Sequence, residues 1–172
     1  IIRKDGIIRH IVFESKFEFD KQGKPLKIHG VIHDITEKVA AEQEKEFDRK
    51  NLSALINNTR DLIWSVDRKF NLITSNQAFD DIIKKRIGKI IEKGSNIFPS
   101  EFDKEKLSRF KAFYERAFLG ETFTEFEHSE ETWSEISFYP IRKNNEVIGT
   151  ACYSRDITAR KKVEEEILQQ NE

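Results

Sequence analysis

The chain has 172 residues, with 30 Lys and Arg against 31 Asp and Glu and a formal net charge of -1 at pH 7. This balance gives no overall electrostatic attraction to nucleic acid or to an anionic membrane surface, so a cationic binder is disfavoured. Hydrophobic residues make up 37% and charged residues 35%, and the 14 Phe supply enough apolar area for a core, which is typical of a globular chain with long solvated helices.

Cys152 is the single cysteine, which excludes an internal disulfide framework and a cysteine-rich zinc site and favours a reducing compartment. No apolar run approaches the roughly 20 residues that cross a bilayer, and no signal peptide opens the chain. We therefore expect a cytoplasmic protein. Because the chain contains no Met and starts inside a strand-like pattern, we expect it to be an internal piece of something larger.

An internal near-repeat is the most informative feature. Residues 22–34 (QGKPLKIHGVIHD) and 144–156 (NNEVIGTACYSRD) each combine a hairpin turn with a strand pattern and continue into Ile-Thr and a charged helical stretch. Two copies of one such ending predict tandem domains of one type. We interpret residues 1–35 as the C-terminal strands of a first domain that has lost its front half, and we expect them to be poorly ordered or packed against another chain.

Residues 36–58 are rich in Glu, Lys and Ala without Gly or Pro, which predicts one continuous helix. Residues spaced three or four apart along this helix form a stripe that is only partly apolar, because polar residues alternate with Val39, Phe47 and Leu55. Such a stripe favours weak pairing with another helix or a sheet, as in a signalling linker.

The next segment predicts a hairpin and a helix. Residues 61–67 (DLIWSVD) and 70–75 (FNLITS) are β-rich and joined by a short polar turn. Ser75 or Asn76 can cap a helix over 77–83, and residues 88–98 form a connecting segment without an assigned element.

A longer helix is expected over residues 101–119, where Ser100 and Asp103 have capping-box spacing and Gly120 ends the helix. Three strand patterns follow at 122–128, 132–142 and 146–155, and their short polar turns predict antiparallel neighbours; another charged helix starts at 158. This order predicts an α+β domain with a five-stranded antiparallel sheet covered by helices on one face.

Three motifs resemble the PAS sensory domain family: residues 61–67 followed by Asn76, the run WSEISFYP at 133–140, and the Asp-Ile-Thr at 156–158 that closes the last strand. The resemblance implies a PAS-like fold flanked by long linker helices, with a complete PAS domain over residues 59–158, after the linker at 36–58 and before a signalling helix from 159. Tandem PAS arrays commonly lie upstream of bacterial histidine kinases or diguanylate cyclases, so the resemblance implies a signal-input module.

Catalytic, metal and cofactor chemistry are disfavoured. His29 and His33 belong to a strand pattern, in which four residues span roughly 13 Å, too far for one ion. Neither a nucleophile elbow nor a glycine-rich phosphate loop is present. Haem-binding PAS relatives supply an axial His from the long helix, and flavin-binding relatives supply a Cys between the helices. The sequence has neither. His128 is expected at the end of a strand as an ordinary exposed turn residue, and Cys152 in the last strand as a buried, inert thiol. We expect no cofactor, while an unidentified small ligand stays open.

A ligand pocket is one interpretation of the inner sheet face. Strand alternation, with the resemblance selecting the inner side, gives a mostly apolar set of candidate pocket residues: Trp64, Val66, Phe110, Phe113, Tyr114, Ser134, Ile136, Phe138, Thr150, Cys152 and Ser154. The same composition suits a filled hydrophobic core, and we favour the filled core over the pocket.

The outer sheet face is too apolar to remain wet. Its apolar residues are Ile63, Trp133, Tyr139 and Tyr153. In one interpretation, the domain's own N-terminal helix covers these residues through Leu52, Leu55 and Ile56. In the other, a second subunit covers them in a symmetric dimer. The two interpretations are compatible.

Asp156 and Thr158 stand where the last strand becomes a helix, and Asp34 and Thr36 stand at the same place in the first copy. These side chains can cap the helix start. They can also transmit a strain in the sheet to the helix, if the strand-to-helix junction has two populated arrangements.

Our leading hypothesis is a non-enzymatic sensory and relay segment of a multidomain bacterial protein, in which a small ligand or partner biases the sheet and the flanking helices pass the change to a downstream output domain. We expect a homodimer, no nucleic-acid partner and no membrane insertion of this segment. The alternative is a ligand-free dimerisation spacer, and an enzyme or redox-cofactor protein is the third reading.

Overall fold

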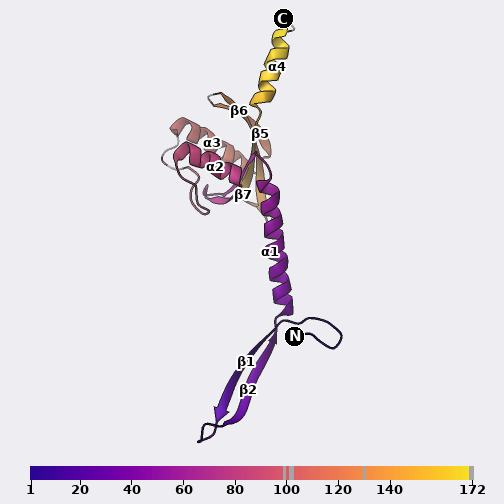
Figure 1. Ribbon diagram of the computed structural model, residues 1–172. Helices are drawn as coiled ribbons and strands as arrows, with labels where there is room; N and C mark the ends of the chain where they lie inside the picture. Colours follow the sequence, from indigo (N-terminus) through magenta and orange to yellow (C-terminus); the bar gives the residue numbers. More distant parts are fainter. Residues whose placement is uncertain (99, 101–102, 130, 171–172) are drawn as a thin grey trace. The chain divides into compact units, whose positions relative to one another are not determined.

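A computed structural model of the chain describes residues 1–98, 100, 103–129 and 131–170 (Figure 1). The chain divides into two compact units, Ile1–Leu52 and Ser53–Glu172. Among the described residues, no helix combines the length and the apolar character needed to cross a membrane.

The first unit is an antiparallel hairpin that continues into a helix. β1 (Ile11–Phe19) pairs with β2 (Pro25–Asp34), starting from Ile11 opposite Asp34. One face of this hairpin carries Phe13 opposite Ile32 and Phe17 opposite Ile28, and all four side chains are at least half exposed. α1 (Thr36–Asn57) follows directly, which confirms the predicted helix to within one residue, and none of its residues is buried.

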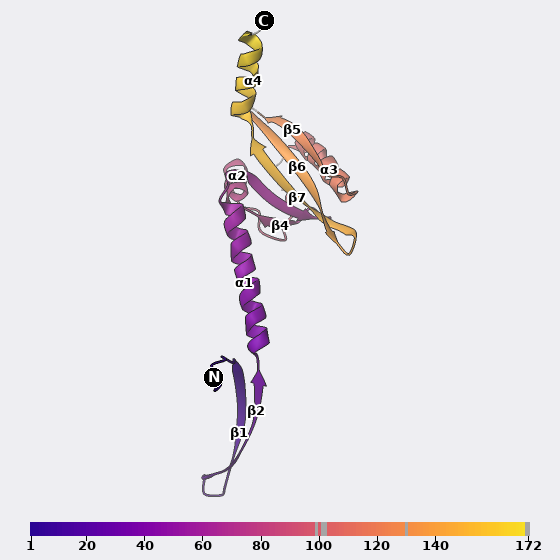
Figure 2. The ribbon, with the colours of Figure 1, turned by 90° about the vertical axis from the view of Figure 1, so that its right-hand side faces the viewer.

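The second unit is built on five strands: β3 (Leu62–Asp67), β4 (Leu72–Ser75), β5 (Phe123–Ser129), β6 (Thr132–Lys143) and β7 (Glu146–Asp156). Their order in the sheet is β4-β3-β7-β6-β5, and every neighbouring pair is antiparallel. α2 (Gln77–Ile87) and α3 (Lys104–Phe118) lie on one side of the sheet (Figure 1), and α4 (Thr158–Gln170) continues from the end of β7 (Figure 2). The predicted sheet with helices on one face is therefore confirmed.

The helix ends follow from their capping side chains. Asn76 caps α2 by accepting a hydrogen bond from the Phe79 N–H at 3.0 Å, and Gly88, at φ 77°, ends the helix four residues beyond the predicted end. The predicted helix over 101–119 includes Asp103, but Asp103 is instead the cap of α3, which begins at Lys104, because the Asp103 carboxylate accepts the first free N–H groups, from Glu105 and Lys106. Residues 101 and 102 lie outside the described part of the chain.

The two central strands approach each other closely. A methyl group at Gly149 would lie 2.3 Å from the Val66 carbonyl oxygen, so β7 can pass β3 at this point only without a side chain. At the start of β7, Asn144 and Asn145 form the two-residue turn from β6 with φ values of 49° and 68°. These features hold the sheet in the register that brings the site residues together.

Candidate functional site

A cavity of about 150 Å³ lies between the inner face of the sheet and the helices. Leu62 and Trp64 of β3, Ile136 of β6 and Ser154 of β7 form its floor. Apolar residues of α2, α3 and the segment between them form the opposite wall: Phe79, Ile82, Ile83, Ile97, Phe98, Leu107, Phe110 and Tyr114. The cavity is thus enclosed by elements from both layers of the domain.

Trp64 is a fixed part of this wall. Its indole ring stacks on Phe79 with ring centroids 5.0 Å apart, and its Nε1–H donates a hydrogen bond of 2.6 Å to the Tyr114 hydroxyl. Burial raises the pKa of Tyr114 well above its usual value, so the hydroxyl stays neutral and available as an acceptor. The two aromatic residues therefore hold each other in place across the two layers.

The candidate pocket residues divide into two groups. Six line the cavity: Trp64, Phe110, Tyr114, Ser134, Ile136 and Ser154. The other five pack in the core beside it, which corrects their assignment to the pocket: Val66, Phe113, Phe138, Thr150 and Cys152. Phe138, for example, contacts the rings of Phe113 and Phe123, at 5.7 and 4.9 Å between centroids. One end of the inner face is thus filled core, and the other end borders a cavity.

Sequence reasoning found Phe110 and Tyr114 of α3 but missed the part of the cavity wall formed by α2 and by the segment between the two helices. Phe79, Ile82 and Ile83 share the apolar face of α2, so the helical spacing contained this signal. Ile97 and Phe98 belong to the segment without an assigned element, and no local pattern indicates that they close the cavity.

The cavity also has polar walls. Ser154 is 5% exposed, and its hydroxyl has no hydrogen-bond partner among the described residues. Arg86 and Lys106 are exposed cations of the lining, and Lys106 donates to Ser129 at 2.9 Å. Glu127, the carboxylate of the described lining, forms an ion pair with Arg109.

Behind the cavity, Asn76 joins three elements through four hydrogen bonds. Its Oδ1 accepts from the N–H groups of Ile63 and Phe79, both at 3.0 Å. Its Nδ2 donates to the carbonyl oxygens of Ile56 and Asp61, both at 2.9 Å. The end of α1, the start of β3 and the start of α2 are therefore tied by one fully buried side chain, which is 1% exposed.

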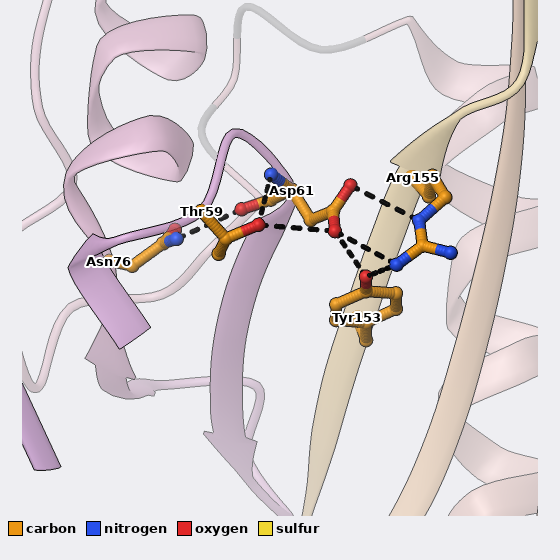
Figure 3. A network of polar contacts seen from close by, with 5 residues as sticks. All are labelled: Thr59, Asp61, Asn76, Tyr153 and Arg155. Atoms are coloured by element: carbon orange, nitrogen blue, oxygen red, sulfur yellow. Dashed lines mark hydrogen bonds and ion pairs between the residues drawn. The ribbon is translucent and has the colours of Figure 1, made fainter. Parts of the chain in front are cut away.

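A second polar cluster joins β3 to β7 on the outer face (Figure 3). The Asp61 carboxylate accepts hydrogen bonds from the Tyr153 hydroxyl, from the Arg155 guanidinium at 3.2 and 3.4 Å, and from the Thr59 hydroxyl at 3.1 Å. Burial alone would raise the pKa of Asp61, but these hydrogen bonds and the charge of Arg155 outweigh burial and hold the pKa below its ordinary value. Figure 3 also shows Asn76 reaching the Asp61 carbonyl, so the two clusters meet at this residue.

The predicted junction residues have matching geometry in the two units. The Asp156 carboxylate accepts from the Thr158 N–H at 2.8 Å and hydroxyl at 2.5 Å, and the Thr158 hydroxyl accepts from the Trp133 N–H at 2.9 Å. In the first unit, Asp34 accepts from the Thr36 N–H at 3.0 Å and hydroxyl at 2.5 Å, and the Thr36 hydroxyl accepts from the His10 N–H at 2.9 Å. These hydrogen bonds lower the pKa of both carboxyl groups. Each junction ties its helix start to the neighbouring strand.

The outer face is only partly covered. Trp133, Tyr153 and Ile63 are half-buried, whereas Tyr139 is 49% exposed. Leu52 and Leu55, which were expected to cover this face, are themselves 58% and 67% exposed, and Ile56 is half-buried. Within the second unit, the last turn of α1 is held by hydrogen bonds from the Asn76 amide to the Ile56 carbonyl and from the Gln77 N–H to the Asn57 side chain.

The remaining candidates offer little chemistry. The described residues contain no group of three or more side chains able to hold a metal ion, and His29 and His33 both lie in β2. His128 is exposed and lies near the end of β5, as expected, but it is a strand residue and not a turn residue, and its ring stacks on Trp133 at 4.4 Å. Cys152 is buried as predicted, and burial strongly raises the pKa of its thiol. This thiol is neutral at physiological pH and unreactive.

The geometry defines an α+β domain with a five-stranded antiparallel sheet, an inner cavity and a polar network behind it. The family model described as PAS fold matches residues 56–162, and the chain belongs to this family. PAS domains are generally non-catalytic sensory modules, and those of histidine kinases commonly dimerise and connect to output domains. No curated protein is significantly similar to the chain in sequence.

Solved PAS-type structures resemble the chain at low sequence identity. The sensory box sensor histidine kinase from Vibrio cholerae is 17% identical, with 69% of this chain and 98% of that chain covered and a TM-score of 0.46. The PAS domain of Bordetella pertussis BvgS is 18% identical, with 74% and 98% covered and a TM-score of 0.48. A domain of the putative light and redox sensing histidine kinase from Haloarcula marismortui is 21% identical, with 63% and 99% covered and a TM-score of 0.45. At these levels, none of the three identifies a ligand or a partner of this chain.

Proposed function

We propose that residues 59–158 form a sensory input and relay module, in which occupancy of the cavity changes the polar network behind it and the flanking helices transmit the change. One observation carries this proposal. Ser154 lines the cavity, and its two neighbours in β7, Tyr153 and Arg155, hold Asp61 on the other face.

The same alternation holds on β3. Leu62 lines the cavity opposite Ser154, and the preceding residue, Asp61, is the centre of the network. Successive side chains of a strand point to opposite faces, so a group that displaces Leu62 or Ser154 moves the backbone that carries the network. A displacement of well-packed strands is transmitted because the core has little free volume to absorb it.

The network reaches both flanking helices. Asn76 joins the Asp61 carbonyl to the Ile56 carbonyl in α1, and Arg155 directly precedes the Asp156 cap of α4. Binding that favours one arrangement of β3 and β7 therefore shifts the equilibrium at both helix junctions by its differential affinity for the two arrangements. We assign the relay role to Asp156 and Thr158 on this basis, and the corresponding role in the first unit to Asp34 and Thr36.

We further propose that residues 1–35 are the closing hairpin of a preceding domain of the same type. The matched hydrogen bonds of His10, Asp34 and Thr36 with those of Trp133, Asp156 and Thr158 support this interpretation. The exposed apolar face of the hairpin corresponds to the face that the second unit buries under its helices. A histidine kinase or diguanylate cyclase is the parent protein that best suits such an array.

A ligand-free dimerisation spacer is the second candidate function. The exposure of Leu55, Tyr139 and Phe126, at 67%, 49% and 56%, favours a second copy of the chain on the outer face. A monomer by light scattering at high concentration would contradict this candidate.

Filling the cavity without a ligand tests the relay. We expect Ser154→Leu to speed amide exchange of residues 56–63 and 155–158 by about fivefold, because the larger side chain displaces both strands at the cavity wall. Ser108→Leu, on the exposed side of α3 and outside the cavity lining, is the matched control and should leave these amides unchanged. Unchanged exchange in Ser154→Leu, with the variant folded, would overturn the sensory proposal.

A further inference from the structure

We propose that the cavity takes a small aromatic carboxylate of about the size of benzoate. This inference rests on the proposed function, since it names the chemical class of the group that the cavity binds. It is argued from the volume, the apolar walls, the unpaired hydroxyl and the charges of the lining.

The volume limits the ligand to one ring. A dry protein cavity of about 150 Å³ is large enough to bind benzene, whereas sites for drug-sized molecules and larger cofactors measure roughly 300–1,000 Å³. The cavity here measures about 150 Å³, so its enclosed part holds a single ring. Haem and flavin are far larger than this space.

The walls favour a flat apolar body. The stacked rings of Trp64 and Phe79 form one side, and Ile83, Ile97 and Ile136 are all at least nine-tenths buried around the same space. A planar ring can make offset or edge contacts with the aromatic pair while it displaces no polar group of the protein. An aliphatic chain of the same volume would lose more rotational freedom on binding.

Ser154 indicates that the ligand also carries a hydrogen-bonding group. The Ser154 hydroxyl borders the cavity and makes no hydrogen bond to any described residue, so it is free to bond to a ligand. Ser134 lies on the same strand face two residues from Ile136, lines the same cavity and is likewise unpaired within the described chain. A ligand oxygen can accept from either hydroxyl.

The charges of the lining favour an anion. Arg86 and Lys106 belong to the lining, and Arg86 forms no ion pair with any described residue. Glu127 is the acidic group of the described lining, and Arg109 already neutralises it. The described lining residues therefore carry a net positive charge, and a guanidinium binds a carboxylate through two parallel hydrogen bonds.

The proposal is tested by titration of the full chain carrying Trp133→Phe, in which Trp64 is the sole tryptophan and reports on the cavity by fluorescence. The probes are benzoate, its neutral isostere benzamide, and toluene. We expect benzoate to bind about tenfold more tightly than benzamide, and Arg86→Gln to remove most of this difference. Ser154→Ala should weaken benzoate by about fivefold, while Lys85→Gln, a neighbouring cation outside the lining, should change nothing.

The outcomes separate this inference from the proposed function. Equal affinity for benzoate and benzamide, or an equal effect of Arg86→Gln and Lys85→Gln, would overturn the assignment of an anionic ligand. Failure of all three probes to bind would overturn the ligand class, while the exchange response of Ser154→Leu would still support the sensory function. If Ser154→Leu also left amide exchange unchanged, both the ligand class and the proposed sensory function would be overturned.

Discussion

Asn76→Ala is expected to be among the most destabilising single substitutions in the second unit. The side chain is 1% exposed and makes four hydrogen bonds, to the backbone of Ile56, Asp61, Ile63 and Phe79. Alanine leaves two N–H groups and two carbonyl oxygens without these partners, at about 1–3 kcal/mol for each buried group. Because Ile56, Asp61 and Ile63 are half-buried and water can reach part of their backbone, we expect the lower end of this range, a total loss of about 4 kcal/mol. A loss of this size is a large fraction of the stability of a typical domain.

Urea unfolding followed by circular dichroism measures the effect as a shift of the midpoint at constant slope. Asn57→Ala is the matched control, since Asn57 also bonds the start of α2, through the Gln77 N–H at 2.7 Å, but is exposed. The control should lose at most about 1 kcal/mol. Equal losses in the two variants would refute the reasoning that the buried position of Asn76 makes it a structural hub.

Three further predictions concern the sheet and its network. Because Asp61 has a lowered pKa in the folded state, its ionised form stabilises the fold above the unfolded pKa of about 3.9, and this contribution is lost as pH falls through the lower folded pKa. The stability difference between wild type and Asp61→Asn should therefore be largest at neutral pH and shrink below about pH 4, as measured by urea unfolding across the pH range. Tyr114→Phe should cost about 2 kcal/mol in thermal unfolding, because the buried Trp64 N–H loses its acceptor. Gly149→Ala should cost about 2 kcal/mol in urea unfolding, because its new methyl group would meet the Val66 carbonyl.

Each of these predictions has a distinct failing outcome. A stability difference for Asp61→Asn that stays constant down to pH 2 would show that its charge contributes nothing. A loss for Tyr114→Phe no larger than that of Tyr139→Phe, at an exposed tyrosine, would remove the role of the buried hydroxyl. For Gly149→Ala, stability equal to that of wild type would mean that β3 and β7 tolerate a wider spacing.

The sheet could be predicted from the sequence because its signals are local. Alternation over 61–67 and turn residues such as Asn144 and Asn145 fix strands and hairpins without reference to distant residues. The start of α3 could not be predicted, since Ser100 and Asp103 are both good capping residues and only the packing of the helix decides between them.

The site was predictable in part for the same reason. Alternation separates the inner from the outer face of a strand, but it says nothing about depth along the strand, so Ser154 at the cavity and Cys152 in the filled core were assigned together. The Asp61 network had no sequence signal, because Tyr153 and Arg155 lie 92 and 94 residues away and meet Asp61 only through the pairing of β3 with β7.

The central claim is that the cavity communicates with the α4 junction through the Asp61 network. The most direct measurement is amide exchange at Ile157 and Thr158 in Ser154→Leu, compared with Ser154→Leu combined with Tyr153→Phe. The account predicts that Ser154→Leu accelerates exchange about fivefold in the wild-type background. In the Tyr153→Phe background, which lacks a hydroxyl donor to Asp61, adding Ser154→Leu should accelerate exchange far less. The same acceleration with and without the Tyr153 hydroxyl would contradict the account.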